Sequence, residues 1–251
     1  MTNLNNKKLT FIAIGECMVE LTAQAGNKQC KIGFAGDTFN TTWYMKAFSD
    51  EISWDVAYFT RVGEDQLSTE LLEFIQKSNI NTQYISRDCE RHLGLYMSQM
   101  IDGDRIFTYW RDNSAAREMF CTKIHFEHAI AMADKLYFSG ITLAILTKDN
   151  RDWLIASLKH ARTQGKTVIF DPNIRFNLWK HHDEIKHYIN EAARVSDIVL
   201  PSFDDEKIKL SENDESSYNV TNHDYQKKIN SVKNEKIKKS LIKLSKVFKT
   251  K

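Results

Sequence analysis

Residues 33–42 (GFAGDTFNTT) combine the residue types that suit close contact between a backbone and a small ligand. Glycine, present here as Gly36, permits positive φ angles and the near approach of a ligand. Asp37 and Thr38 are types that cap a helix, and Asn40 offers one donor and one acceptor on the first turn of that helix. The stretch predicts either a ligand-contacting turn or an ordinary turn with a helix cap.

A second group of polar residues follows an apolar run near position 170. Residues 166–170 (KTVIF) predict a strand, and residues 171–175 (DPNIR) place an acid, an amide and a guanidinium directly after it. Ligands of open α/β sheets bind at the carboxyl ends of the strands. The sequence therefore predicts a ligand site that includes Arg175.

The elements that must hold these groups follow an α/β rhythm. Strands are predicted at residues 9–15, 18–22, 53–60, 135–139, 166–170 and 196–200. Helices are predicted after the turn at 33–40 to about residue 48, at 148–162 and after Pro201, with turns at 62–65 and 140–142. A further amphipathic helix is predicted from the helical spacing of Leu67, Leu71, Phe74 and Ile75. Alternating strands and helices are typical of a parallel sheet covered by helices.

One segment interrupts this rhythm. Residues 94–100 (GLYMSQM) and 105–110 (RIFTYW) are two strand-like runs joined across Asp-Gly at 102–103, a strong hairpin signal. The segment carries Tyr96, Tyr109 and Arg111. It is interpreted either as an edge hairpin with aromatic cross-strand packing or as a lid over a pocket.

Composition limits the class of protein. The 251 residues are 42% hydrophobic and 27% charged, as in a soluble globular protein with one large core or a core and a small appendage. No apolar run approaches the roughly 20 residues that span a bilayer, and no signal-like segment follows the first residues. These features predict a cytoplasmic protein that binds neither membrane nor nucleic acid.

The cysteines and histidines give weak signals. Cys17, Cys30, Cys89 and Cys121 show no C-x-x-C spacing, so buried free thiols are expected rather than disulfides or a zinc site. Two groups of histidines, at 125–128 and 181–187, are predicted to lie on solvent-facing helices. No metal site is expected from either group.

The chain changes character near residue 206. Residues 207–251 carry twelve lysines and five acidic residues, and they contain neither glycine nor proline. Ile237, Leu241, Leu244 and Phe248 recur at helical spacing, which indicates either a solvated tail or a basic amphipathic helix. A solvated or loosely docked tail is the favoured interpretation.

Seven ordered motifs resemble those of the ribokinase-like (PfkB) carbohydrate kinases over residues 9–206. They are 14–21 (IGECMVEL), 36–40 (GDTFN), 62–65 (VGED), 94–96 (GLY), 109–111 (YWR), 139–142 (SGIT) and 171–175 (DPNIR). The resemblance implies a Rossmann-like α/β sandwich with a small β-sheet lid, formed by segments at about 16–33 and 92–112. It implies transfer of phosphate from ATP, with magnesium, to the 6-hydroxyl of 2-keto-3-deoxygluconate, and a homodimer through the lid.

The resemblance also implies a sugar site. Gly36 and Asn40 would line it, Ile141 would pack on the sugar, and Arg175 would meet its carboxylate end. Tyr96, Tyr109 and Arg111 would reach the site from the lid. Guanidinium groups bind a planar carboxylate through two parallel hydrogen bonds, so two arginines suit a sugar acid better than a neutral hexose.

The sequence departs from the family pattern in two places. Ala35 stands where many family members have glycine, which is a mild change. The family's catalytic run, Asp-Thr-x-Gly-Ala-Gly-Asp, is absent, and no Walker motif replaces it, so no catalytic residue is assigned. We therefore expect an incomplete kinase domain at 1–206, truncated at its C-terminus, and an aberrant tail at 207–251 produced by a frameshift, deletion or fusion.

Two alternatives to a sugar-acid kinase stay open. The first is a kinase for another sugar, such as fructose or ribose. The second is a non-catalytic remnant that binds a sugar acid or forms dimers. As written, the chain is expected to be either an active kinase or an inactive remnant.

Overall fold

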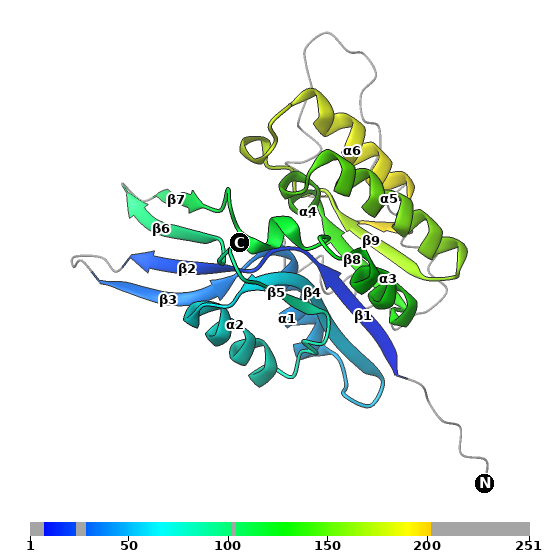
Figure 1. Cartoon of the computed structure of the whole chain (residues 1–251), viewed down its shortest axis with the longest axis horizontal. Coiled ribbons are helices and arrows are strands. Elements are labelled where there is room, and N and C mark those ends of the chain that lie inside the picture. Colours follow the sequence, from blue (N-terminus) through cyan, green and yellow to red (C-terminus); the bar gives the residue numbers. More distant parts are fainter. Residues whose placement is uncertain (1–7, 24–28, 102–103, 202–251) are drawn as a thin grey trace. The chain divides into compact units, whose positions relative to one another are not determined.

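The structure is a computed structural model that describes residues 8–23, 29–101 and 104–201. These residues form two β-sheets with helices packed on the larger one (Figure 1). Three predicted features lie outside the described residues: the tail at 207–251, the helix after Pro201 and the Asp-Gly turn at 102–103.

Six parallel strands form the central sheet in the order β10-β9-β8-β1-β4-β5. Their bounds are β1 Leu9–Ile14, β4 Trp54–Gly63, β5 Ile85–Asp88, β8 Lys135–Ser139, β9 Thr167–Asp171 and β10 Ile198–Val199. All residues of β1 after the first are buried, as its continuous apolar sequence predicts. The predicted strands are confirmed, although β4 continues beyond residue 60 and β10 is shorter than predicted.

Helices cover both faces of the central sheet (Figure 1). They are α1 Asp37–Phe48, α2 Gln66–Lys77, α3 Lys123–Met132, α4 Gly140–Ile145, α5 Lys148–Thr163 and α6 Asp183–Arg194. The ring of Tyr58 in β4 lies 5.5 Å from Phe39 of α1, whereas the ring of Phe59 lies 4.9 Å from Phe126 of α3. Because adjacent residues of a strand point to opposite faces, α1 and α3 cover opposite faces of the sheet.

The second sheet, called the lid sheet below, has four strands in the order β3-β2-β6-β7. Their bounds are β2 Met18–Ala23, β3 Cys30–Ala35, β6 Leu95–Ile101 and β7 Asp104–Trp110. Strands β6 and β7 are antiparallel, which confirms the predicted hairpin. Figure 1 shows the lid sheet projecting from the central sheet, and every residue of β7 is exposed.

The start of α1 differs from the prediction. Gly36 is the N-cap residue and Asp37 is the first residue of the helix, so neither Asp37 nor Thr38 caps it. The Thr38 hydroxyl is instead 3.0 Å from the Tyr58 hydroxyl. The side chains that were expected to close the helix end are used in tertiary contacts.

Residues 140–142 also differ from the prediction, because they begin α4 rather than form a turn. Ser139 and Thr142 make reciprocal capping hydrogen bonds at the start of this helix. At residues 62–65 the first two positions still belong to β4, and Asp65 caps α2 by accepting a hydrogen bond from the Ser68 N–H, 3.0 Å away. Strand β5 was not predicted, whereas α3 and α6 were expected only as the solvent-facing helices of the two histidine groups.

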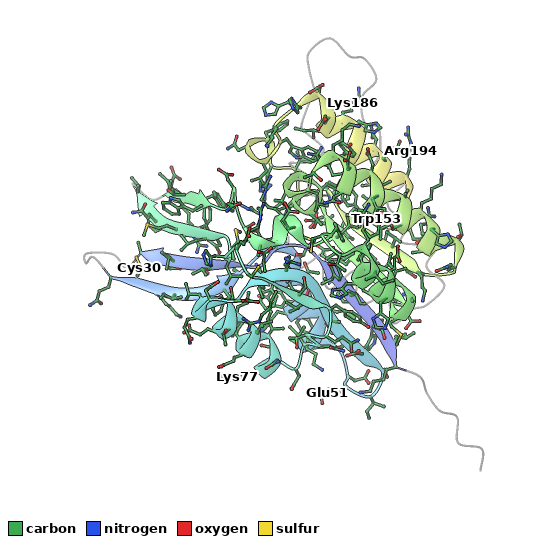
Figure 2. All side chains as sticks on the ribbon, in the orientation of Figure 1. Cys30, Glu51, Lys77, Trp153, Lys186 and Arg194 are labelled. Carbon is green, nitrogen blue, oxygen red and sulfur yellow. The ribbon has the colours of Figure 1, made fainter. Side chains whose placement is uncertain are left out.

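All four cysteines are free, but the expectation that they are buried is correct only for Cys17. Cys30 is exposed at the start of β3 (Figure 2), and Cys89 and Cys121 are also exposed. Burial raises the pKa of the Cys17 thiol well above its usual value, and the neighbouring Glu16 carboxylate raises it further. Over the described ranges, no helix is both long enough and apolar enough to cross a bilayer.

Candidate functional site

The carboxyl edge of the central sheet brings the start of α1 next to the segment after β9. The Asn173 amide donates to the Asp37 carboxylate over 3.0 Å, although the two residues are 136 positions apart. The Tyr137 hydroxyl donates to Asp171 and accepts from Thr41, each over 3.3 Å. These contacts join α1, β8 and β9 at the edge where ligands of α/β sheets bind.

Tyr137 remains protonated in this cluster. Burial raises the pKa of its phenol well above the usual value, and the negative charges of Asp171 and Asp37 raise it further. The hydroxyl can therefore act as a hydrogen-bond donor and acceptor between the strands and α1. This role of Tyr137 is not predictable from sequence, because the residue lies in an ordinary apolar strand.

Gly36 is required by packing rather than by an unusual backbone angle. Its φ of −174° is extended and open to any residue. A Cβ atom at this position, however, would overlap the carbonyl oxygen of Glu16 and would lie 3.2 Å from the Cα of Cys17. The close approach that the glycine permits is between two segments of the protein itself.

Asn40, Ile141 and Arg175 lie around the same edge. Asn40 is exposed on the first turn of α1, and Ile141 is half-buried at the start of α4. Arg175 is exposed, and its guanidinium donates to the Ile174 carbonyl over 3.0 Å. A Cβ atom on Gly140 would overlap the Pro172 carbonyl, so the start of α4 packs directly on the segment that carries Arg175.

The two lid tyrosines lie opposite each other on adjacent strands. Tyr96 of β6 and Tyr109 of β7 are register partners with ring centroids 5.7 Å apart. Tyr96 is buried and Tyr109 is half-exposed. Burial raises the pKa of Tyr96, and the adjacent Glu20 carboxylate raises it further. Both rings supply flat apolar surface that ends in a hydroxyl group.

Arg111, directly after β7, is almost completely buried. Its guanidinium lies 6.0 Å from the Tyr109 ring centroid and forms an ion pair with the carboxylate of Glu16. The side chains of Arg111 and Glu16 are 5% and 1% exposed. Sequence reasoning placed Arg111 in the site but gave no role to Glu16, whose only signal was an acid directly after a buried strand.

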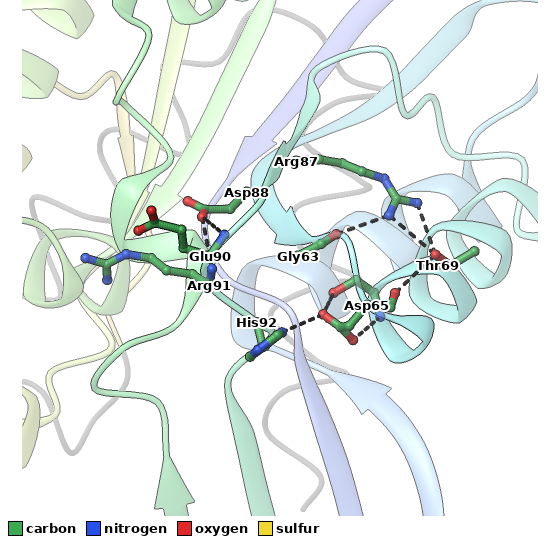
Figure 3. A network of polar contacts seen from close by, with 9 residues as sticks. Gly63, Asp65, Thr69, Arg87, Asp88, Glu90, Arg91 and His92 are labelled. Atoms are coloured by element: carbon green, nitrogen blue, oxygen red, sulfur yellow. Dashed lines mark hydrogen bonds and ion pairs between the residues drawn. The ribbon is translucent and has the colours of Figure 1, made fainter.

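A second polar network fixes the segment that leads into β6 (Figure 3). Asp65 accepts from Ser68 and lies 3.1 Å from the His92 ring. Arg87 donates to the Gly63 carbonyl over 3.2 Å. The Asp88 carboxylate accepts from the backbone N–H groups of residues 90 and 91. The 62–65 motif thus anchors the segment before β6 to the central sheet and α2, and it does not contact the candidate site.

The predicted site residues therefore form two groups. Gly36, Asn40, Ile141 and Arg175 lie at the sheet edge, and Tyr96, Tyr109 and Arg111 lie on the lid sheet. Gly36 and Arg111 both contact Glu16, which connects the groups.

Magnesium is one of the groups that the resemblance implies. Among the described residues, no three His, Cys, Asp or Glu side chains are grouped to hold a metal. We assign none of them to ATP or Mg²⁺. The described part of the chain supplies groups suited to a sugar, with carboxylate, amide, phenol and guanidinium functions.

The chain is similar in sequence to known carbohydrate kinases. The profile described as "pfkB family carbohydrate kinase" matches residues 9–246, beyond the expected limit of the resemblance at 206. A 2-dehydro-3-deoxygluconokinase of Haemophilus influenzae is 36% identical over 205 residues, covering 80% of this chain and 64% of that protein. The chain thus spans less than two thirds of that relative.

Solved structures share the fold. A PfkB protein from Polaromonas sp. JS666 has a TM-score of 0.69 at 25% identity, covering 77% of this chain and 65% of that one. A fructokinase with bound ATP from Xylella fastidiosa has a TM-score of 0.66 at 18% identity, covering 76% and 56%.

Proposed function

Because the chain belongs to the pfkB family of carbohydrate kinases, we propose that it binds 2-keto-3-deoxygluconate and takes part in its phosphorylation by ATP at the 6-hydroxyl. The name of the Haemophilus influenzae relative supports this substrate. The contact between Asp37 and Asn173 carries the proposal, because it joins the segments of Gly36, Asn40 and Arg175 at one edge. A single small ligand can then meet residues from distant parts of the chain.

Each predicted site residue has a role in this proposal. Arg175 is exposed at the sheet edge and pairs with the substrate carboxylate through two parallel hydrogen bonds. Asn40 exchanges hydrogen bonds with sugar hydroxyls, and Ile141 packs on the carbon chain. Tyr96 and Tyr109 cover the sugar from the lid sheet, and Arg111 offers N–H donors beside them.

The transfer step needs more than these residues. ATP, with Mg²⁺, supplies the phosphoryl group when bound. The sequence lacks the family's glycine-rich run with its aspartate, which orients the phosphates and takes the hydroxyl proton. We therefore propose acceptor binding for the described residues and assign no catalytic base among them. The separate character of residues 207–251 also stays a proposal.

A second candidate function is sugar-acid binding without turnover. The observation that favours it is the complete lid sheet and sheet edge in a sequence without the catalytic run. A kinase for fructose or ribose is less well supported, because the likeness to the fructokinase shows only the fold. The cytoplasm, where ATP is available, is the proposed compartment.

We further propose that the chain forms a homodimer through the lid sheet. The edge strand β7 exposes Phe107, Tyr109 and Trp110 at 42%, 50% and 57%. An exposed apolar edge strand is a surface on which another strand can pair. Sedimentation velocity of the purified chain and its Trp110→Glu variant tests this. A dimer that the variant converts to monomer supports it, and a monomeric unmodified protein contradicts it.

The function is tested by two measurements on the purified chain. Isothermal titration with 2-keto-3-deoxygluconate and with fructose measures binding, and a coupled assay with ATP and Mg²⁺ measures ADP release. Selective binding with turnover supports the kinase, and selective binding without turnover supports the non-catalytic alternative. Equal affinity for both sugars, or no binding by folded protein, would contradict the proposed substrate.

A further inference from the structure

Four segments, called crossings below, connect the lid sheet to the central sheet and its helices (the body), and each of them contains or adjoins Glu16. This residue itself lies in the first crossing, between β1 and β2. Its carbonyl occupies the space next to Gly36, in the crossing from β3 to α1. Its Oε1 atom lies 2.7 Å from where a Cβ of Gly94 would be, in the crossing from β5 to β6. Its Oε2 atom accepts from Arg111, directly after β7.

The carboxylate balances the charge of Arg111. Both side chains are at least nine-tenths buried, and a buried guanidinium is strongly unfavourable without an anionic partner. Without the carboxylate, the long arginine side chain would turn its charged end toward water. The observed position of Arg111, close to the Tyr109 ring, therefore depends on Glu16.

The pair is incompletely satisfied. The Nε of Arg111 and the Oε1 of Glu16 are both buried, and neither has a hydrogen-bond partner among the described residues. A guanidinium has five N–H donors in a rigid fork, and one of its terminal nitrogens is occupied by Glu16. The Nε of Arg111 is therefore a donor that the described residues leave unpaired, close to the Tyr109 ring.

We propose that Glu16 is a positioning residue for the sugar acid. It holds the Arg111 guanidinium in place, and the donors that Glu16 leaves unused meet the substrate carboxylate or an adjacent hydroxyl. This inference rests on the proposed function for the identity of the ligand. The fixed position of Arg111 is a separate consequence that can be measured without any ligand.

The first test uses phenylglyoxal, which modifies accessible arginines, followed by peptide mass spectrometry. In the unmodified protein we expect Arg111 to react slowly. In Glu16→Gln, which keeps the side-chain shape but removes the charge, we expect it to react at least about fivefold faster. Glu184→Gln is the matched control. It breaks a partly buried ion pair, in which the Arg151 guanidinium lies 2.7 Å from the Glu184 carboxylate, outside the lid sheet. Equal protection of Arg111 in Glu16→Gln would overturn the proposal.

The second test is a double-mutant cycle by titration with 2-keto-3-deoxygluconate. Glu16→Gln should weaken binding about tenfold or more, and Glu184→Gln should leave it unchanged. In an Arg111→Met background, Glu16→Gln should change affinity less than about twofold, because no guanidinium remains to be positioned. Tighter binding by Glu16→Gln, or the same loss in both backgrounds, would overturn the role. If the unmodified protein does not bind this sugar acid, the proposed function fails, and the labelling result still decides whether Glu16 positions Arg111.

Discussion

Replacing Gly36 by alanine tests whether the junction between the lid sheet and α1 is as tight as the structure shows. The backbone angle at Gly36 is extended, so alanine meets no dihedral strain. The added methyl group would overlap the Glu16 carbonyl oxygen and lie 3.1 Å from its carbonyl carbon. The obstacle is backbone, which cannot rotate away, so one segment must move by roughly 1 Å.

The cost can be estimated from two contributions. Overpacking against a rigid neighbour costs about 1–3 kcal/mol. Alanine is also a poorer N-cap residue than glycine, by roughly 0.5 kcal/mol. We therefore expect Gly36→Ala to lower the free energy of unfolding by about 2–3 kcal/mol, which in urea moves the midpoint down by roughly 1 M. Because the Glu16 backbone must shift, binding of the sugar acid should also weaken.

Gly33→Ala is the matched control for this experiment. It makes the same chemical change three residues earlier, but the nearest atom to its new Cβ is a Glu20 carboxylate oxygen at 3.9 Å, which is ordinary contact. Alanine is preferred to glycine inside a strand by about 0.5–1 kcal/mol, so this variant should be neutral or slightly more stable. A loss below about 0.5 kcal/mol for Gly36→Ala, or an equal loss for both variants, would refute the packing argument.

Two further predictions concern the polar clusters. Tyr137→Phe removes the hydroxyl between Thr41 and Asp171 but keeps the ring, so urea unfolding should show a loss of about 1 kcal/mol and titration a weaker affinity for the sugar acid. Unchanged stability and affinity would contradict this role. Burial raises the pKa of Asp65, but hydrogen bonds from Ser68 and His92 outweigh it and lower the pKa below its usual 3.8. Its stabilising contribution is therefore present above pH 3.8 and lost as the pH falls through the lowered value. Asp65→Asn should be less stable at neutral pH, with a difference that shrinks in acid, and a pH-independent difference would contradict the assignment.

Local patterns predicted most of the fold because each was consistent with its surroundings. The apolar run is buried on both faces from Thr10 to Ile14, and the two predicted hairpin strands pair over the full length of β6 and β7. Predictions failed where side chains served tertiary contacts instead of local ones. Asp37 and Thr38 are good capping residues, yet they bond to Asn173 and Tyr58, which are distant in sequence.

Gly36 also shows that local sequence patterns do not reveal tertiary contacts. The sequence indicated that Gly36 permits close approach, but a glycine does not reveal which atom approaches it. The structure assigns that space to the Glu16 carbonyl, a contact between two segments that flank the lid sheet. Glu16 itself could not be selected from sequence, because a single acid after a strand is most often exposed.

The two arginines of the candidate site differ in burial and in ion pairing, and these differences decide what each can offer a ligand. The family resemblance placed Arg175 at the carboxylate end of the sugar and Arg111 on the lid, and both guanidinium groups were expected to favour a sugar acid. In the structure Arg175 is exposed and hydrogen bonds to a carbonyl, whereas the buried charge of Arg111 is already balanced by Glu16. Among the described residues, no carboxylate pairs with Arg175, so a ligand carboxylate there would meet a positive charge that is still available, while one at Arg111 would gain mainly directed N–H donors. Within the proposed function, we therefore expect Arg175 to contribute most of the charge recognition of a sugar acid and Arg111, held by Glu16, to orient it.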